Sequence, residues 1–110
     1  MREYEHDHAL TAHWAAANRA LIAKMIGELT YEQVLTLEAD GPGLRLDLGA
    51  AGVWRLRAHH NMWGQPQVDP DSLWPPAGAG LEAADFLLVL APVLGMDDAQ
   101  VAEHLEDLYA

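Results

Sequence analysis

Two arginines and two adjacent histidines lie close together in the segment RLRAHHNMW, residues 55–63. Arginine side chains bind carboxylates and phosphates, and histidine side chains bind metal ions or transfer protons near neutral pH. The whole chain has only 6 Lys and Arg residues against 17 Asp and Glu residues, and its formal net charge is -11. This local concentration of positive groups is compatible with a metal site, an anion-binding strand or an ordinary solvated face of a sheet.

A metal site is the least favoured of these three interpretations. His59 and His60 are adjacent, so on a strand their rings point to opposite faces and cannot readily chelate one ion. The N-terminal histidines, His6, His8 and His13, lack the i, i+4 spacing that places two imidazoles on one helical face. The chain also lacks cysteine, HExxH, GxSxG and a glycine-rich phosphate loop. Apart from a weak site in the N-terminal EHDH, the sequence predicts no metal site and no catalytic residues.

The composition predicts one globular domain. The 110 residues are 51% hydrophobic and 21% charged, a balance typical of folded proteins. The longest apolar run, residues 86–94, is too short to span a bilayer, and the N-terminus lacks the apolar core of a signal peptide. An acidic chain of this kind repels the phosphates of nucleic acids. We therefore expect a soluble, cytoplasmic protein with no nucleic-acid partner and no membrane partner.

Hydrophobic periodicity predicts an α+β fold, with a long N-terminal helix, a small antiparallel sheet of about three strands, and two C-terminal helices. The first helix is expected between Thr11, which would cap it, and Leu29. Its apolar stripe includes Trp14, which we expect in the core together with Trp54. A T-x-x-Q capping box predicts a short second turn or helix at residues 31–35.

Two stretches of alternating residues, LRLDLG and VWRLRAH, predict two strands joined by a hairpin. Pairing Gly49 with Val53 leaves a three-residue loop that ends in a glycine. This register gathers the apolar residues on one face, whereas a slip by one residue would mix the two faces. The apolar pairs are then Leu48 with Trp54, Leu46 with Leu56, and Leu44 with Ala58. A third strand over residues 63–68, weakened by Pro66, is expected at an edge of the same sheet.

The same register places four candidate contact residues on the outer face of the sheet: Arg45, Arg55, Arg57 and His59. It sets Arg45 opposite Arg57 and Asp47 opposite Arg55. Like charges that face each other across two strands destabilise a sheet slightly unless a counter-charge relieves them. The simplest interpretation is a solvated strand face. The alternative is a face that contacts an acidic partner surface or a carboxylate substrate.

The C-terminal part of the chain predicts a loop and two helices. Residues 69–80 are rich in proline and glycine, and residues 81–95 read as a buried helix that Pro92 kinks or ends and Gly95 caps. The last helix opens with Asp97 as its N-cap and Gln100 three residues later. Its apolar residues form a candidate interface with a partner or with a second copy of the chain: Val101, Leu105, Leu108 and Tyr109.

Three segments carry a resemblance to a known family. They are HWAAANRALIAKMIGELTYEQVL, LRLDLGAAGVWRLRAHHNMWGQPQVDPDSL and FLLVLAPVLGMDDAQVAEHLEDLYA. In this order they resemble the N-terminal region of the NRPS-independent siderophore synthetases of the aerobactin-synthetase type, the IucA/IucC family. The similarity covers residues 13–110. It rests on the order and spacing of the segments together, because none of them is a catalytic signature.

The resemblance implies a single domain over residues 1–110 that corresponds to the thumb of a hand-shaped enzyme. Enzymes of this family use ATP and magnesium to adenylate citrate or a related acid, and then pass the acyl group to an amine or hydroxyl. Their His-Pro…His-Lys segment has no match here, because AHHNM lacks both proline and lysine. The resemblance thus implies a domain with no catalysis and no cofactor of its own, whose partner is the remainder of a synthetase on the same or a separate chain. The alternative is a stand-alone binding or dimerisation module that keeps the thumb fold.

Overall fold

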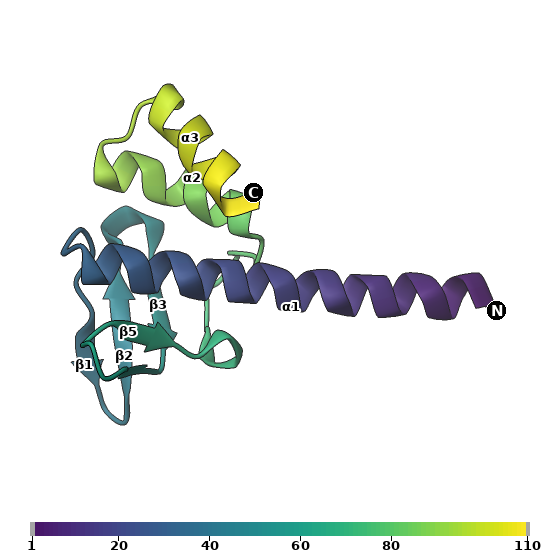
Figure 1. Ribbon diagram of the computed structural model, residues 1–110, viewed down its shortest axis with the longest axis horizontal. Coiled ribbons are helices and arrows are strands. Elements are labelled where there is room, and N and C mark those ends of the chain that lie inside the picture. Colours follow the sequence, from purple (N-terminus) through teal and green to yellow (C-terminus); the bar gives the residue numbers. More distant parts are fainter. Residues whose placement is uncertain (1, 110) are drawn as a thin grey trace.

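The structure, a computed structural model, describes the backbone of residues 2–109 and the side chains of residues 13–103 and of Glu106. The helices are α1 (Arg2–Tyr31), α2 (Ala83–Leu94) and α3 (Asp98–Tyr109), with short 3-10 helices at Gly49–Ala51 and Pro70–Ser72. The strands are β1 (Glu38–Asp40), β2 (Gly43–Asp47), β3 (Val53–Leu56), β4 (Ala58–His60) and β5 (Pro66–Val68). In the view of Figure 1 the strands lie below the C-terminal half of α1, and α2 and α3 lie above it. The predicted α+β fold is confirmed.

Helix α1 is longer than the sequence pattern predicted. It begins at Arg2, so Thr11 lies inside the helix and is not its N-cap. The buried face is formed by Ile22, Ala23 and Ile26, which follow helical spacing. Trp14 lies off this face with 60% of its surface exposed, so the prediction that it belongs to the core is wrong.

The predicted T-x-x-Q capping box is not formed, but of the two alternatives at residues 31–35, a turn or a helix, the structure has the turn. Thr30 is still helical, and the residues that follow Tyr31 form a turn rather than a new helix. The N–H groups of Val34 and Leu35 both donate to the carbonyl of Leu29, at 2.8 and 3.1 Å. These bonds close the end of the helix, and they lead Leu35 into the core.

Strands β1, β2 and β3 form an antiparallel sheet in this order. The register of the predicted hairpin is wrong by two residues, because Leu44 pairs with Leu56 and Leu46 pairs with Trp54. A shift of two residues keeps each side chain on its expected face, so Leu46, Trp54 and Leu56 are buried as predicted.

The longer connection between β2 and β3 explains the register. The N–H of Gly49 donates to Oδ1 of Asp47 at 2.9 Å, and the N–H of Leu48 donates to the carbonyl of Gly52 at 2.9 Å. Gly52 itself has a φ of 98°, which favours glycine. These contacts enclose a 3-10 turn in place of the predicted three-residue loop.

The predicted third strand is not part of this sheet. Only Pro66–Val68 is extended, and it pairs with β4 to form a separate two-stranded sheet. This hairpin packs against α1 at Gly27, where a Cβ atom would lie 2.9 Å from the carbonyl oxygen of Pro66. Glycine at this position therefore allows the helix and β5 to approach each other closely.

The caps that the sequence predicted for the C-terminal helices are confirmed, and α2 begins at Ala83 and continues past Pro92 to Leu94. Gly95 caps α2 in the left-handed conformation, with a φ of 70°. Asp97 and Gln100 form a reciprocal capping box: each backbone N–H donates to the other side chain, at 2.9 and 2.8 Å. In the described part of the chain, no helix is long and apolar enough to cross a membrane.

Asn18, which the sequence pattern did not single out, connects α1 to α2. Its side chain is buried, its Nδ2 donates to the carbonyl of Trp14 at 3.0 Å, and its Oδ1 accepts from the N–H of Ala83 at 2.8 Å. An asparagine 65 residues away thus satisfies an N–H group at the start of α2. Beside this contact, Trp54 and Phe86 pack edge to face, with ring centroids 5.0 Å apart.

Candidate functional site

The arginines of the three-stranded sheet pair differently from the prediction. Arg45 lies opposite Arg55, not opposite Arg57, and Asp47 lies opposite Val53, not opposite Arg55. The correction follows from the two-residue shift of the hairpin register. Two like charges do face each other across β2 and β3, but they are a different pair.

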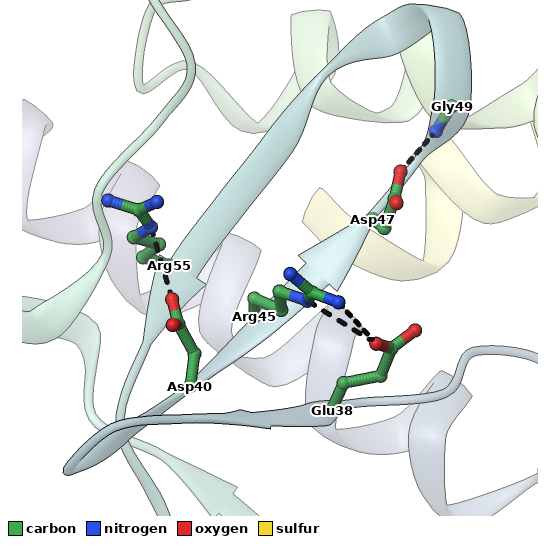
Figure 2. A network of polar contacts seen from close by, with 6 residues as sticks. All are labelled: Glu38, Asp40, Arg45, Asp47, Gly49 and Arg55. Atoms are coloured by element: carbon green, nitrogen blue, oxygen red, sulfur yellow. Dashed lines mark hydrogen bonds and ion pairs between the residues drawn. The ribbon is translucent and has the colours of Figure 1, made fainter.

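Strand β1 supplies the counter-charges for both of these arginines (Figure 2). Glu38 Oε2 accepts from Nη2 of Arg45 at 2.8 Å and from its Nε at 3.3 Å. Asp40 Oδ2 lies 3.2 Å from Nε of Arg55. The hydrogen bond and the negative charge of Glu38 raise the pKa of Arg45 above its ordinary value. The like-charge contact is therefore relieved within the chain.

Neither β1 nor this ion-pair network was predicted from the sequence. The signal was the segment LEADGPGL, in which DGPG forms a turn between two short extended stretches. Glu38 pairs with Arg45 in the register of β1 and β2, which brings their side chains together. Asp47, which was expected to neutralise an arginine, instead accepts the bond from Gly49 described above.

Arg57 lies at a break between β3 and β4. Its backbone N–H donates to Oγ of Ser72 at 2.7 Å, and its carbonyl accepts from the N–H of Asp69 at 2.9 Å. The hydroxyl of Ser72 also donates to the carbonyl of Asp69 at 2.7 Å. The loop after β5 thus holds the strand where it passes from one sheet to the other.

The side chains of Arg57 and His59 are exposed. Among the residues whose side chains are described, neither makes an ion pair. His59 lies opposite Gln67 in the two-stranded sheet, whereas Arg45 and Arg55 belong to the three-stranded sheet. The four candidate contact residues therefore do not form one continuous stripe. They divide into two ion-paired arginines and two solvent-facing cationic or titratable groups.

Of the candidate interface on α3, only Val101 has a described side chain, and it is half-buried. Leu105, Leu108 and Tyr109 lie outside the residues whose side chains are described. Within the described residues, no three side chains of histidine, aspartate or glutamate gather to hold a metal ion.

An open groove of about 640 Å³ lies between α1 and β5. Lys24, Glu28 and Glu32 line its helical side, and Gln65 and Gln67 line its strand side. Lys24 and Glu28 lie one helical turn apart, with Nζ and Oε1 4.0 Å from each other. We assign no chemistry to this groove.

The chain is similar in sequence to two aerobactin synthases. It is 36% identical to that of Vibrio mimicus over 106 residues, and 42% identical to that of Escherichia coli over 98 residues. These matches cover 93% and 88% of this chain. The fold is similar to that of aerobactin synthetase IucC from a hypervirulent pathotype of Klebsiella pneumoniae, with a TM-score of 0.74 and 43% identity over 88% of this chain. The chain is related to the IucA/IucC-type siderophore synthetases.

This relationship concerns one portion of the synthetases. The chain spans 18% and 17% of the length of the two curated relatives, and 18% of the Klebsiella pneumoniae chain. No family model matches the chain. The synthetase relationship therefore rests on individual relatives that agree in identity, in coverage and in fold.

Proposed function

We propose that this chain is a thumb-like domain in siderophore biosynthesis, acting as part of an ATP-dependent synthetase or beside one. The observation that carries the proposal is its similarity, at 36 to 43% identity, to aerobactin synthases over nearly its whole length. The synthetase would condense a citrate-type carboxylate with an amine or hydroxyl in the cytoplasm, where ATP is available. Within such a synthetase, the chain would shape or cover the substrate cleft, and other parts of the enzyme would catalyse the reaction.

ATP and magnesium enter this proposal only through the synthetase as a whole. The carboxylates at the arginine-bearing sheet, Glu38 and Asp40, are already paired with Arg45 and Arg55. They do not suit a magnesium ion, which takes oxygen ligands in a near-octahedral arrangement. We therefore derive no step of the reaction through residues of this chain.

Within the domain, we assign different roles to the four candidate contact residues. Arg45 and Arg55 stabilise the sheet through their ion pairs with β1. Arg57 and His59 are the groups proposed to meet an acidic partner surface or a carboxylate substrate. A guanidinium that points into solvent can attract an anion even on an acidic molecule, and this effect weakens as salt is added.

The proposal is tested by exchanging segments. In the Escherichia coli aerobactin synthase, this chain replaces the segment that it matches, and the same enzyme with the segment deleted is the control. We expect citrate-dependent ATP–pyrophosphate exchange by the chimera, and none by the control or by the isolated chain. Exchange by the isolated chain would contradict the proposal, and so would a folded but inactive chimera. Dimerisation of the isolated chain, together with an inactive chimera, would favour the stand-alone module.

A further inference from the structure

The turn between β4 and β5 presents two large apolar side chains to solvent. Met62 is 86% exposed and Trp63 is 76% exposed, more than the other large hydrophobic side chains of the described residues. Single exposed apolar residues are normal on protein surfaces. Two adjacent ones at the turn of this hairpin form a compact surface, which we call the Met-Trp tip.

The Met-Trp tip is held in one shape by the side chain of Asn61. Its Oδ1 accepts from the N–H groups of Trp63 and Gln65, both at 3.0 Å. Its backbone N–H donates to the carbonyl of Gln65, and its carbonyl accepts from the N–H of Gly64, both at 3.0 Å. Gly64 completes the turn with a φ of 79°, a conformation that favours glycine. The exposed side chains therefore project from an ordered turn.

The tip also differs in charge from the rest of the molecule. Residues 55–68 contain two arginines and two histidines and no Asp or Glu, although the chain has 17 acidic residues. His59 lies on β4, which leads to the tip, and Arg57 directly precedes this strand; both side chains are exposed. A surface of this composition fits an apolar pocket with carboxylates around its rim.

We propose that the Met-Trp tip docks into an apolar, acid-rimmed pocket on the remainder of a siderophore synthetase, with Trp63 as the main anchor. This inference rests on the proposed function. The relatives are more than five times longer than this chain, so the remainder of a synthetase is the largest available partner surface. A second copy is disfavoured as the occupant because two molecules of net charge -11 repel each other. Tryptophan and arginine are the residues most often responsible for binding energy at interfaces, and a pre-ordered turn loses little entropy on docking.

The test measures how fast hydroxyl radicals oxidise Met62 and Trp63, read by mass spectrometry of the peptides. The isolated chain is compared with the Escherichia coli aerobactin synthase chimera that carries it. Trp74 is a matched internal control, because it is 70% exposed on a different loop. We expect the oxidation of both tip residues to slow several-fold in the chimera, while oxidation of Trp74 changes less. Equal oxidation of the tip in both proteins would overturn the proposal.

A second measurement uses separate chains, so that it also serves if the chimera does not fold. The probe is the Escherichia coli aerobactin synthase from which the matched segment has been deleted. Trp63→Ala should weaken binding of this chain to the probe about 30-fold, as for an aromatic hot spot, and Trp74→Ala should weaken it much less. Equal effects of the two substitutions would overturn the proposal, and so would no binding of the wild-type chain.

The other outcomes separate this inference from the proposed function. Oxidation of the tip that slows in the isolated chain as its concentration rises would identify a second copy as the occupant and overturn the inference. An active chimera whose tip stays fully reactive would overturn the docking and leave the proposed function standing. A folded, inactive chimera with a protected tip would contradict the proposed function and support the docking surface.

Discussion

The two halves of the segment 53–68 carry similar residues and use them in opposite ways. In β3, Trp54 is 2% exposed and packs on Phe86, and Arg55 is paired with Asp40. In the β4–β5 hairpin, Trp63 is 76% exposed, and the described residues supply no carboxylate partner to His59. The difference comes from what lies across from each half. Strand β1 supplies acids and α2 supplies an apolar face to β3, whereas Met62 and Trp63 at the tip of the hairpin are exposed.

The arginines and histidines of residues 55–60 therefore do not act as one group. Similar spacing along the sequence suggested one cationic stripe, but the chain changes sheets at Arg57. The part before the break is stabilised by contacts within the domain. The part after it has the exposed apolar and cationic groups that suit a contact outside the domain.

The largest effect should come from the buried tryptophan. Replacing Trp54 by alanine should lower the free energy of unfolding by about 3–5 kcal/mol, because it leaves a cavity beside Phe86. Such a loss is a large part of the roughly 5–15 kcal/mol that stabilises a typical domain. Urea unfolding of the isolated chain measures it. Trp63→Ala is the matched control, and a change within about 0.5 kcal/mol is expected for it. Similar losses for both substitutions would remove the contrast between the halves.

The second-largest effect should come from Ser72, which holds the break between β3 and β4 at Arg57. Ser72→Ala removes the hydroxyl that accepts from the N–H of Arg57 and donates to the carbonyl of Asp69. We expect a loss of about 0.5–1.5 kcal/mol, the usual net value of such hydrogen bonds. Thermal unfolding of Ser72→Ala and of the hydroxyl-keeping control Ser72→Thr checks this. An unchanged Ser72→Ala protein would show that the break at Arg57 is held by other contacts.

The third effect concerns the counter-charges from β1. Asp40→Asn leaves Arg55 opposite Arg45 with one carboxylate fewer. Since the pair is partly exposed, the loss of stability should be only about 0.2–1 kcal/mol. It should be greater at low salt, where the repulsion between the arginines is less screened. Urea unfolding at two salt concentrations measures this, and a loss that does not depend on salt would contradict the electrostatic account.

The smallest effect is expected at Arg57 itself. Arg57→Gln should leave the stability of the isolated chain unchanged within about 0.5 kcal/mol, because the side chain is exposed and only its backbone is tied to the loop. Binding to a partner or substrate should weaken. A loss of stability above about 1 kcal/mol would show that the Arg57 side chain stabilises the fold.

The sequence predicted the faces of the hairpin better than its pairing. Side chains on a strand alternate between its two faces, so a register shift of two residues leaves each side chain on the same face. Leu46 and Trp54 are therefore buried as predicted, whereas the residue opposite each arginine differs from the prediction. The register is set by the turn in which Asp47 accepts a hydrogen bond from Gly49. The alternation of apolar and polar residues in the two strands does not specify the length of this turn. Strand β1, at three residues, is too short to show a period.

Other parts of the fold depended on contacts between distant residues. The capping box at Asp97 and the cap at Gly95 are local, and both were predicted correctly. The buried side of α1 is instead decided by the elements that pack on it, which is why Trp14 was misplaced. Asn18 accepts a hydrogen bond from the N–H of Ala83, 65 residues away, and no local sequence pattern indicates such a contact.

The division of segment 53–68 is tested most directly by the oxidation rates of its two tryptophans in the isolated chain. Both residues are measured in one sample by hydroxyl-radical labelling and mass spectrometry, so differences in dose cancel. The account predicts that Trp63 reacts about as fast as Trp74, and that Trp54 is strongly protected under native conditions and loses this protection in urea. Equal reactivity of Trp54 and Trp63 in the native protein would contradict it, as would protection of Trp63 that does not depend on protein concentration.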